Sequence, residues 1–435
     1  MNVDLAPSSA PLIRKTLNNG LTILVRQKRG APIGSFWVWY RVGGRNEVPG
    51  ITGISHWAEH MLFKGTRELP AGEIFRQVSA AGGSLNGFTW LDYTTYFETL
   101  PIDRIDLALR IESDRMLNAR FDAEEVASER TVIISERQGS ENQPTFFLRE
   151  EVNAAAFRAH PYGQGVIGHL SDLQEITRDD LFNHYQTYYR PNNAVAVLVG
   201  SIDPDEAVER IEQHFGGIDP SPHVPPVRTV EPEPQGERRI TVSRPAPNRV
   251  LMMTFLAPAA AHEDVAALTV LDAILSGGKP FSFSGAGGTI GRSSRFYRRF
   301  VSSGLAAGAG SSFSLSIDPY LFSISATLNP DTDQAEFEAL VDEELARLRD
   351  EPIDDIELGR ALRQLQAQWA YGQESVTSQA YWLGSLALVA PDRDADAFID
   401  EIEAVTPADV QRVARTYLAP HRKTVGWLSP SQANA

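Results

Sequence analysis

The chain has 435 residues, which is more than one hydrophobic core usually serves, so we expect two domains. Its 40 lysines and arginines against 56 aspartates and glutamates give a net charge of −16, which opposes binding to nucleic acid or to an anionic membrane. The chain has no cysteine, which excludes disulfides, thiolate zinc sites and cysteine nucleophiles.

The beginning of the chain predicts strands. Residues 1–16 lack an apolar stretch of signal-peptide length, so we expect a cytoplasmic protein, or a periplasmic one if a leader has been removed. No apolar run reaches the length of a membrane span. The apolar stretches "LTILVRQ" and "SFWVWYRVGG", residues 21–27 and 35–44, predict the first strands.

The stretch "GISHWAEHMLFKGT", residues 53–66, predicts a helix with Ser55 near its start. His56 and His60 are four residues apart and therefore project from the same face of this helix, with Glu59 on the adjoining flank. Two imidazoles so placed can hold one zinc ion, which then needs a third protein ligand. The alternative is a pair of surface or hydrogen-bonded core histidines, but the five-residue pattern H-x-x-E-H favours a metal site.

The next two segments predict an edge strand and a long helix. Residues 82–100 alternate and are rich in threonine and aromatics, as in an edge strand; the alternative is an edge covered by another loop. In the helix predicted from "FDAEEVASERTVIISERQGSEN", Glu129 and Glu136 are two turns apart and share a face. The apolar run beside Glu136 predicts a buried carboxylate, which needs a counter-charge such as zinc. A solvated acidic stripe fits Glu124 and Glu125 better.

The chain divides near its midpoint. Residues 216–239 are rich in proline and charge and have no helical or strand period, which predicts a linker. The segments beginning at Ile176 and Val405 can be aligned at one constant offset, each a capped amphipathic helix that leads into an apolar strand. We therefore predict an α+β fold with two homologous α/β-sandwich-like domains, each a mainly antiparallel sheet packed with helices. Their expected bounds are residues 1–218 and 239–435, joined by a linker at 219–238.

The motifs together are specific to one family. "HWAEH" and "SERTVIISE", about 75 residues apart, resemble the pitrilysin family of inverted zinc peptidases (inverzincins), and most of all the small bacterial relatives of the mitochondrial processing peptidase. The likeness covers nearly the whole chain and includes "LNNGLTILV", "LNGFTWLDYTTYFETLP", "HPYGQGVIG", "YYRPNNAVAVLVG" and "GRSSRFYRRF". The second half carries no H-x-x-E-H.

The resemblance implies a metalloendopeptidase and assigns roles residue by residue. One zinc ion per chain would be bound by His56, His60 and Glu136, with Glu59 as the general base that activates water. Glu129 matches the glutamate that orients a ligand histidine. In the family an edge strand pairs with an extended or unfolded peptide, and the residues placed to do so here are Asn86, Gly87 and Phe88.

One departure from the family bears on the partners. Active members place an Arg and a Tyr over the scissile carbonyl, whereas the matching strand here, residues 318–331, contains no Arg; Tyr320 and Arg295 are nearby candidates that do not fit the pattern well. Family chambers are closed by four such domains, so the resemblance implies a dimer. The missing Arg favours a heterodimer with a homologous subunit that supplies Arg and Tyr, with a homodimer as the alternative. The rival function is a non-catalytic core or scaffold subunit of the same fold.

Overall fold

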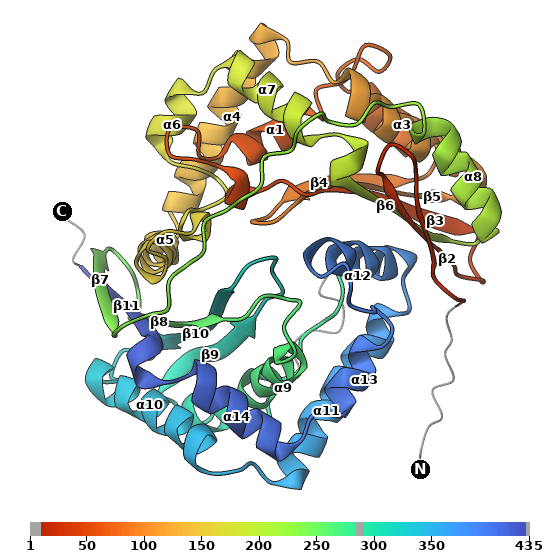
Figure 1. Cartoon of the computed structure of the whole chain (residues 1–435). Helices are drawn as coiled ribbons and strands as arrows, with labels where there is room; N and C mark the ends of the chain where they lie inside the picture. The colour runs from red at the N-terminus through yellow and green to blue at the C-terminus, as the bar shows by residue number, and fades with distance from the viewer. Residues whose placement is uncertain (1–9, 284–290, 432–435) are drawn as a thin grey trace. The chain divides into compact units, whose positions relative to one another are not determined.

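The computed structural model describes residues 10–283 and 291–431 and divides into two compact units (Figure 1). Unit 1 comprises residues 1–137, 165–228 and 373–388, and unit 2 comprises residues 138–164, 229–372 and 389–435. The domain bounds expected on either side of residues 219–238 stay a prediction. Each unit differs from a half of the sequence because it includes a helix from the other half.

The core of unit 1 is a six-stranded sheet with the order β1-β2-β6-β3-β5-β4. Its strands are β1 (Ile13–Thr16), β2 (Thr22–Gln27), β3 (Ile33–Tyr40), β4 (Ser84–Thr89), β5 (Thr94–Pro101) and β6 (Ala194–Gly200). β2 and β6 run parallel, whereas β3 is antiparallel to β6 and β5, and β4 is antiparallel to β5. β4 is therefore an edge strand, as predicted for residues 82–100, but the later part of that stretch forms β5, an interior strand that pairs with both β3 and β4.

The sheet of unit 2 repeats this topology with five strands in the order β7-β11-β8-β10-β9. Its strands are β7 (Arg238–Arg244), β8 (Val250–Ala257), β9 (Ala306–Phe313), β10 (Tyr320–Leu328) and β11 (Lys423–Pro430). β7 and β11 run parallel and every other pair is antiparallel, as in the matching part of the first sheet. The repeated order confirms the predicted duplication of an α+β domain.

Helices cover one face of the sheet in each unit (Figure 1). In unit 1 they are α1 (Ile54–Met61), α2 (Glu73–Ala80), α3 (Ile105–Asn118), α4 (Ala123–Glu141), α6 (Leu170–Glu175), α7 (Arg178–Tyr188) and α8 (Pro204–Phe215). In unit 2 they are α9 (Val265–Ser276), α10 (Gln334–Asp350), α11 (Asp355–Gly372), α13 (Phe398–Glu403) and α14 (Pro407–Tyr417). The two capped helices predicted after Ile176 and Val405 are α7 and α14, and Thr177 and Thr406 form the capping boxes at their starts.

The other face of the first sheet is aromatic and is covered by α12 (Val376–Val389). Trp37 stacks on Phe97 with ring centroids 3.8 Å apart, and Tyr381 of α12 packs against Trp37 and Trp39. A Cβ on Gly384 would lie 2.1 Å from Nε1 of Trp39, so only glycine allows this approach of the helix to the sheet.

Unit 2 uses the same arrangement with α5 (Pro144–Ala156). Leu148 and Val152 of α5 form a small core with Val250 and Leu428 of the second sheet. α5 and α12 thus occupy corresponding places in two duplicated folds, although each comes from the opposite half of the sequence.

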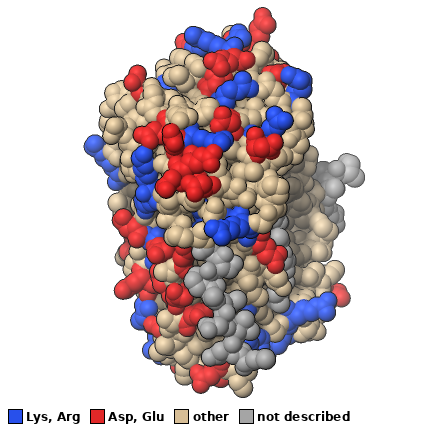
Figure 2. Space-filling model, turned by 90° about the vertical axis from the view of Figure 1, so that its right-hand side faces the viewer, with Lys and Arg blue, Asp and Glu red and all other residues tan. Residues whose placement is uncertain are grey.

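The charged surface and the character of the helices are two further features of the fold. On the face drawn in Figure 2, Lys and Arg side chains are interspersed with Asp and Glu side chains. Within residues 10–283 and 291–431, no helix combines the length and the apolar character that crossing a membrane requires.

Candidate metal centre

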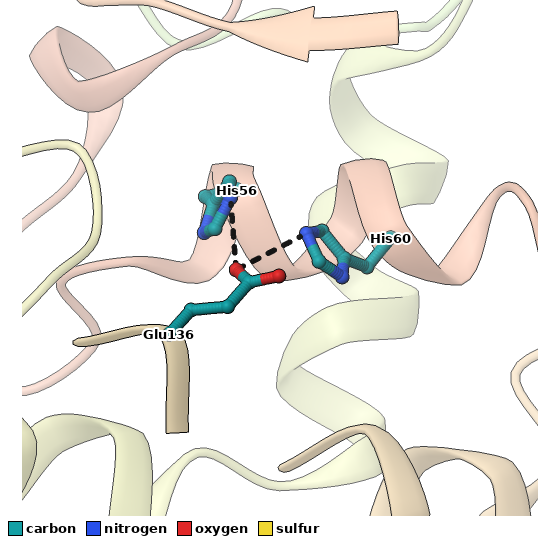
Figure 3. A group of neighbouring side chains, drawn as sticks. All are labelled: His56, His60 and Glu136. Carbon is teal, nitrogen blue, oxygen red and sulfur yellow. Dashed lines mark ion pairs between the residues drawn. The ribbon is translucent and has the colours of Figure 1, made fainter. Parts of the chain in front are cut away.

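Helix α1 presents the two histidines of the H-x-x-E-H pattern. Trp57, Ala58 and Met61 are buried in the core of unit 1 and fix which face of the helix points inward. His56 and His60 therefore project together from the remaining face, with ring centroids 4.7 Å apart (Figure 3).

Helix α4 brings Glu136 to these histidines. Its oxygen Oε2 lies 3.8 Å from Nε2 of His56 and 3.6 Å from Nε2 of His60 (Figure 3). Each residue offers one ligand atom, and the three atoms lie within 4.8 Å of one another. Among the described residues, His56, His60 and Glu136 are the one group of three or more such side chains with this geometry.

The predicted burial of Glu136 is wrong. Its side chain is 43% exposed, and Val132 of the apolar run is also exposed. The buried positions of α4 are Val126, Glu129, Ile133 and Arg137. Their spacing of three and four residues defines the face of α4 that packs on the core, and Glu136 lies outside this face. The carboxylate of Glu136 therefore stays accessible to solvent while it faces the histidines.

Glu129 supports the centre from the buried side of α4. Its Oε1 lies 2.8 Å from Nδ1 of His60, and its Oε2 lies 2.5 Å from the ammonium of Lys64. Burial raises the pKa of Glu129, but the bonds from His60 and Lys64 outweigh this and lower it overall. The carboxylate is thus held ionised, on the ring nitrogen that faces away from Glu136.

The pKa values of the two histidines are shifted in opposite directions. Burial, with a contribution from the charge on His60, lowers the pKa of His56 to about 3, which leaves this imidazole neutral and its lone pair available. For His60, burial also lowers the pKa, but the bond to Glu129 and the nearby charges of Glu136 and Glu59 raise it overall.

Glu59 lies at the rim of the same cluster. It is 7% exposed, and its Oε2 accepts a hydrogen bond from the Thr89 hydroxyl at 2.8 Å. Burial raises the pKa of Glu59, which the bond from Thr89 partly opposes. The carboxylate therefore has a fixed orientation and an increased affinity for a proton.

The donor set fits a divalent transition metal. Two neutral imidazoles and a carboxylate are a combination that catalytic zinc sites use, with the fourth position left open. The two distances from Glu136 to the imidazole nitrogens, 3.8 and 3.6 Å, are close to those of a tetrahedral site, because ligands about 2.1 Å from one ion lie roughly 3.4 Å apart. His60 also has the hydrogen-bonded outer carboxylate that is usual for metal-binding histidines.

The edge strand β4 carries the three residues predicted to bind substrate. Asn86 is exposed and its Oδ1 accepts a hydrogen bond from the Gly87 amide at 2.9 Å. The ring of Phe88 packs against Trp37 and Trp39. A Cβ on Gly87 would lie 3.0 Å from the ring of Phe63, so this position brings the strand close to the residues that follow α1.

Two contributors to the centre were not predicted from the sequence. Lys64 follows His60 by four residues, and that spacing is a signal that could have placed it on the same face as the histidine. Thr89 ends β4, and its bond to Glu59 connects the edge strand to the helix. No local pattern in the sequence predicts the hydrogen bond between Thr89 and Glu59.

Comparison with known proteins shows the family to which the chain belongs. Residues 22–169 match the family described as insulinase (peptidase family M16), and residues 175–365 match the peptidase M16 inactive domain. An uncharacterized zinc protease of Mycobacterium bovis is 31% identical over 96% of this chain and 92% of its own length. The chain belongs to peptidase family M16. The pitrilysin-like family predicted from "HWAEH" and "SERTVIISE" is therefore confirmed.

Two further similarities extend the comparison. A probable mitochondrial-processing peptidase subunit beta of Arabidopsis thaliana is 31% identical over 49% of this chain and 40% of its own. The crystal structure of a protease from Helicobacter pylori has a TM-score of 0.90 at 26% identity, covering 97% of this chain and 100% of that one. His56, His60 and Glu136, the group that could hold a metal ion, lie in the part that matches the insulinase description, and the second half, without H-x-x-E-H, matches the inactive domain.

Proposed function

We propose that this M16 protein is a zinc metalloendopeptidase that hydrolyses peptide bonds in extended or unfolded peptides. The observation that carries the proposal is the cluster of His56, His60 and Glu136 with the Glu59 carboxylate at its rim. One bound zinc ion per chain would supply Lewis-acid chemistry, which makes water nucleophilic near neutral pH and polarises a carbonyl. The chain's own residues supply the remaining steps.

Glu59 is the proposed general base. It takes a proton from the attacking water as the new C–O bond forms, and delivers that proton to the amine nitrogen as the C–N bond breaks. The Thr89 hydroxyl donates to Oε2 of Glu59 and so fixes the direction of the carboxylate. Because burial raises the pKa of Glu59, the carboxylate is a stronger base than an exposed glutamate.

Glu129 is proposed to act through His60. A carboxylate on Nδ1 fixes the tautomer in which Nε2 carries the lone pair, and it holds the ring toward Glu136. Lys64 balances the charge of Glu129 from its other oxygen. Loss of Glu129 is therefore expected to weaken metal binding without unfolding the helix.

β4 is proposed to bind substrate by strand addition. In the described sheet β4 pairs only with β5, so its second edge can pair with an extended peptide. Main-chain pairing at Asn86, Gly87 and Phe88 would recognise backbone rather than a fixed sequence. Thr89, at the end of this strand, would keep the scissile bond near Glu59.

A homologous subunit is the proposed partner, in a chamber closed by dimerisation. Arg295 does not offer a free guanidinium, because it pairs with Glu357 at 2.7 Å and with Glu344 at 3.0 Å. Tyr320 stacks on Phe157 with ring centroids 5.8 Å apart. Both side chains thus have structural partners in unit 2, which supports a related chain as the source of the Arg and Tyr over the carbonyl, with a homodimer as the alternative.

The test is cleavage of an internally quenched, unstructured peptide by the zinc-loaded chain, with Glu59→Gln as the matched control. Cleavage by the wild type that the variant loses supports the proposal and shows that one kind of subunit suffices. If the chain alone is inactive, adding a homologous subunit that carries Arg and Tyr should restore cleavage. A zinc-loaded chain that stays inactive in every such pairing would favour the scaffold function.

A further inference from the structure

The N-terminus of α1 is capped from a distance. Its N-cap residue, Gly53, has no side chain with which to accept a hydrogen bond from the first amides. The carboxylate of Glu47 does this instead: Oε2 accepts from the Gly53 amide at 2.7 Å, and Oε1 accepts from the Ser55 amide at 2.9 Å. Glu47 is 2% exposed, so the cap is buried.

The glycine at the N-cap is required by the backbone. Gly53 has φ 88°, in the left-handed region, and a Cβ there would lie 2.6 Å from the carbonyl oxygen of Ile167. A serine, threonine or aspartate cap is therefore excluded at this position. The hydroxyl of Ser55 donates to the carbonyl of Gly43 rather than to the helix. The capping group must come from elsewhere in the chain.

The two histidines differ in what holds their rings. His60 is oriented by Glu129 through Nδ1. Nδ1 of His56 is buried, and no hydrogen-bond partner for it lies among the described residues. The direction of the His56 ring is consequently set by the backbone of the first turn of α1, whose amide at Ser55 is the one that Glu47 binds.

We propose that Glu47 is a positioning residue of the metal centre, which holds the first turn of α1 so that His56 points at the same place as His60 and Glu136. This rests on the proposed function, since it assigns Glu47 a role at the zinc site. A displacement of the first turn would move His56 relative to Glu136, which α4 holds, and to His60, which lies one turn further along α1 and is held by Glu129. We therefore expect loss of the Glu47 cap to change the geometry of the metal ligands more than the stability of the fold.

The stability of the fold alone does not explain why a glutamate is present at position 47. Burial raises the pKa of Glu47 to about 7, although the amides of Gly53 and Ser55 oppose the shift. A buried carboxylate with such a pKa is costly to ionise, and a neutral cap would suit the fold better. What the carboxylate offers is two acceptor oxygens in one rigid plane, which fix two amides at once.

The experiment compares zinc affinity in Glu47→Gln and in Asp172→Asn, using the full chain. Glutamine retains one acceptor but turns an NH2 group toward the second amide donor. Asp172 accepts from the amides of Gly50 and Thr52 in the same loop and from no amide of α1, so its variant is the matched control. Affinity is measured by competition with a chromophoric chelator, and ligand geometry by the visible absorption of the Co2+ form.

We expect Glu47→Gln to bind zinc about tenfold more weakly and to change the Co2+ spectrum, with Asp172→Asn within about twofold of wild type. A Glu47→Gln chain with wild-type affinity and spectrum would overturn the proposal. Equal losses in both variants would overturn it too, because they would show a general effect of the loop. If Glu47→Gln does not fold, zinc affinity is measured in Glu47→Asp, whose shorter side chain disturbs the cap. Wild-type zinc affinity in that variant would also overturn the proposal. A wild-type chain that binds no zinc would refute the proposed function itself.

Discussion

Replacing Glu129 by glutamine is expected to weaken zinc binding while leaving the fold intact. The carboxylate is 5% exposed and makes two charge-assisted contacts, 2.8 Å to Nδ1 of His60 and 2.5 Å to Nζ of Lys64. Outer carboxylates on metal-binding histidines typically contribute 10- to 100-fold in affinity, or about 1.4 to 2.7 kcal/mol. Glutamine retains one acceptor oxygen, which can still orient His60.

The remaining loss for Glu129→Gln is electrostatic. The amide no longer offsets the charge of Lys64, which is 30% exposed and would lie unpaired on the side of His60. We therefore expect a loss near the lower end, about tenfold for Glu129→Gln, and a loss near 100-fold for Glu129→Ala.

The assay is competition for zinc against a chelator of known affinity, with far-ultraviolet circular dichroism to confirm the fold. Glu124→Gln is the control, because Glu124 is exposed on the same helix and its substitution removes the same charge as Glu129→Gln. Zinc affinity in Glu129→Gln within twofold of the Glu124→Gln value would refute the role assigned to Glu129.

Three further predictions concern catalysis, acid stability and packing. Thr89→Val should lower kcat about tenfold at unchanged zinc affinity, since a hydrogen bond to the ionised Glu59 is lost, and Thr89→Ser should recover most of it. Burial lowers the pKa of His184 to about 3, so stability present above pH 6.5 is lost as the pH falls toward 3, because only the unfolded chain takes up the proton. At pH 5 the loss from His184 should be about 2 kcal/mol, and His184→Gln should abolish it in urea denaturation. Gly384→Ala should cost roughly 1 to 3 kcal/mol of stability, because its Cβ would lie 2.1 Å from the Trp39 indole nitrogen.

Each of these expectations can fail clearly. A Thr89→Ser chain as slow as Thr89→Val would show that the hydroxyl does not orient Glu59. An unchanged slope of stability against pH in His184→Gln would assign the acid sensitivity to other groups. A Gly384→Ala chain as stable as wild type would mean that α12 does not pack on the sheet as closely as it does here.

The local parts of this protein were predictable because they depend on spacing within one element. His56 and His60 four residues apart, and Glu129 and Glu136 seven apart, define faces of helices without reference to the rest of the chain. The duplication was predictable for a similar reason, since the capped helices at Thr177 and Thr406 each lead into a strand.

What could not be predicted depends on contacts between distant segments. The burial of α4 follows from which helices it packs against, and its stripe leaves Glu136 exposed where the apolar run alone suggested otherwise. The place of α12 on the Trp37 and Trp39 face requires a helix from residues 373–388 to join unit 1. The cap from Glu47 likewise depends on a loop whose path no local pattern encodes.

The proposed metal centre is tested most directly by locating zinc in crystals of the zinc-loaded chain, from diffraction data collected on both sides of the zinc absorption edge. We expect one anomalous peak per chain, about 2.0 to 2.2 Å from Nε2 of His56, Nε2 of His60 and a carboxylate oxygen of Glu136. A zinc-loaded crystal with its peak elsewhere, or with no peak at these residues, would contradict this expectation.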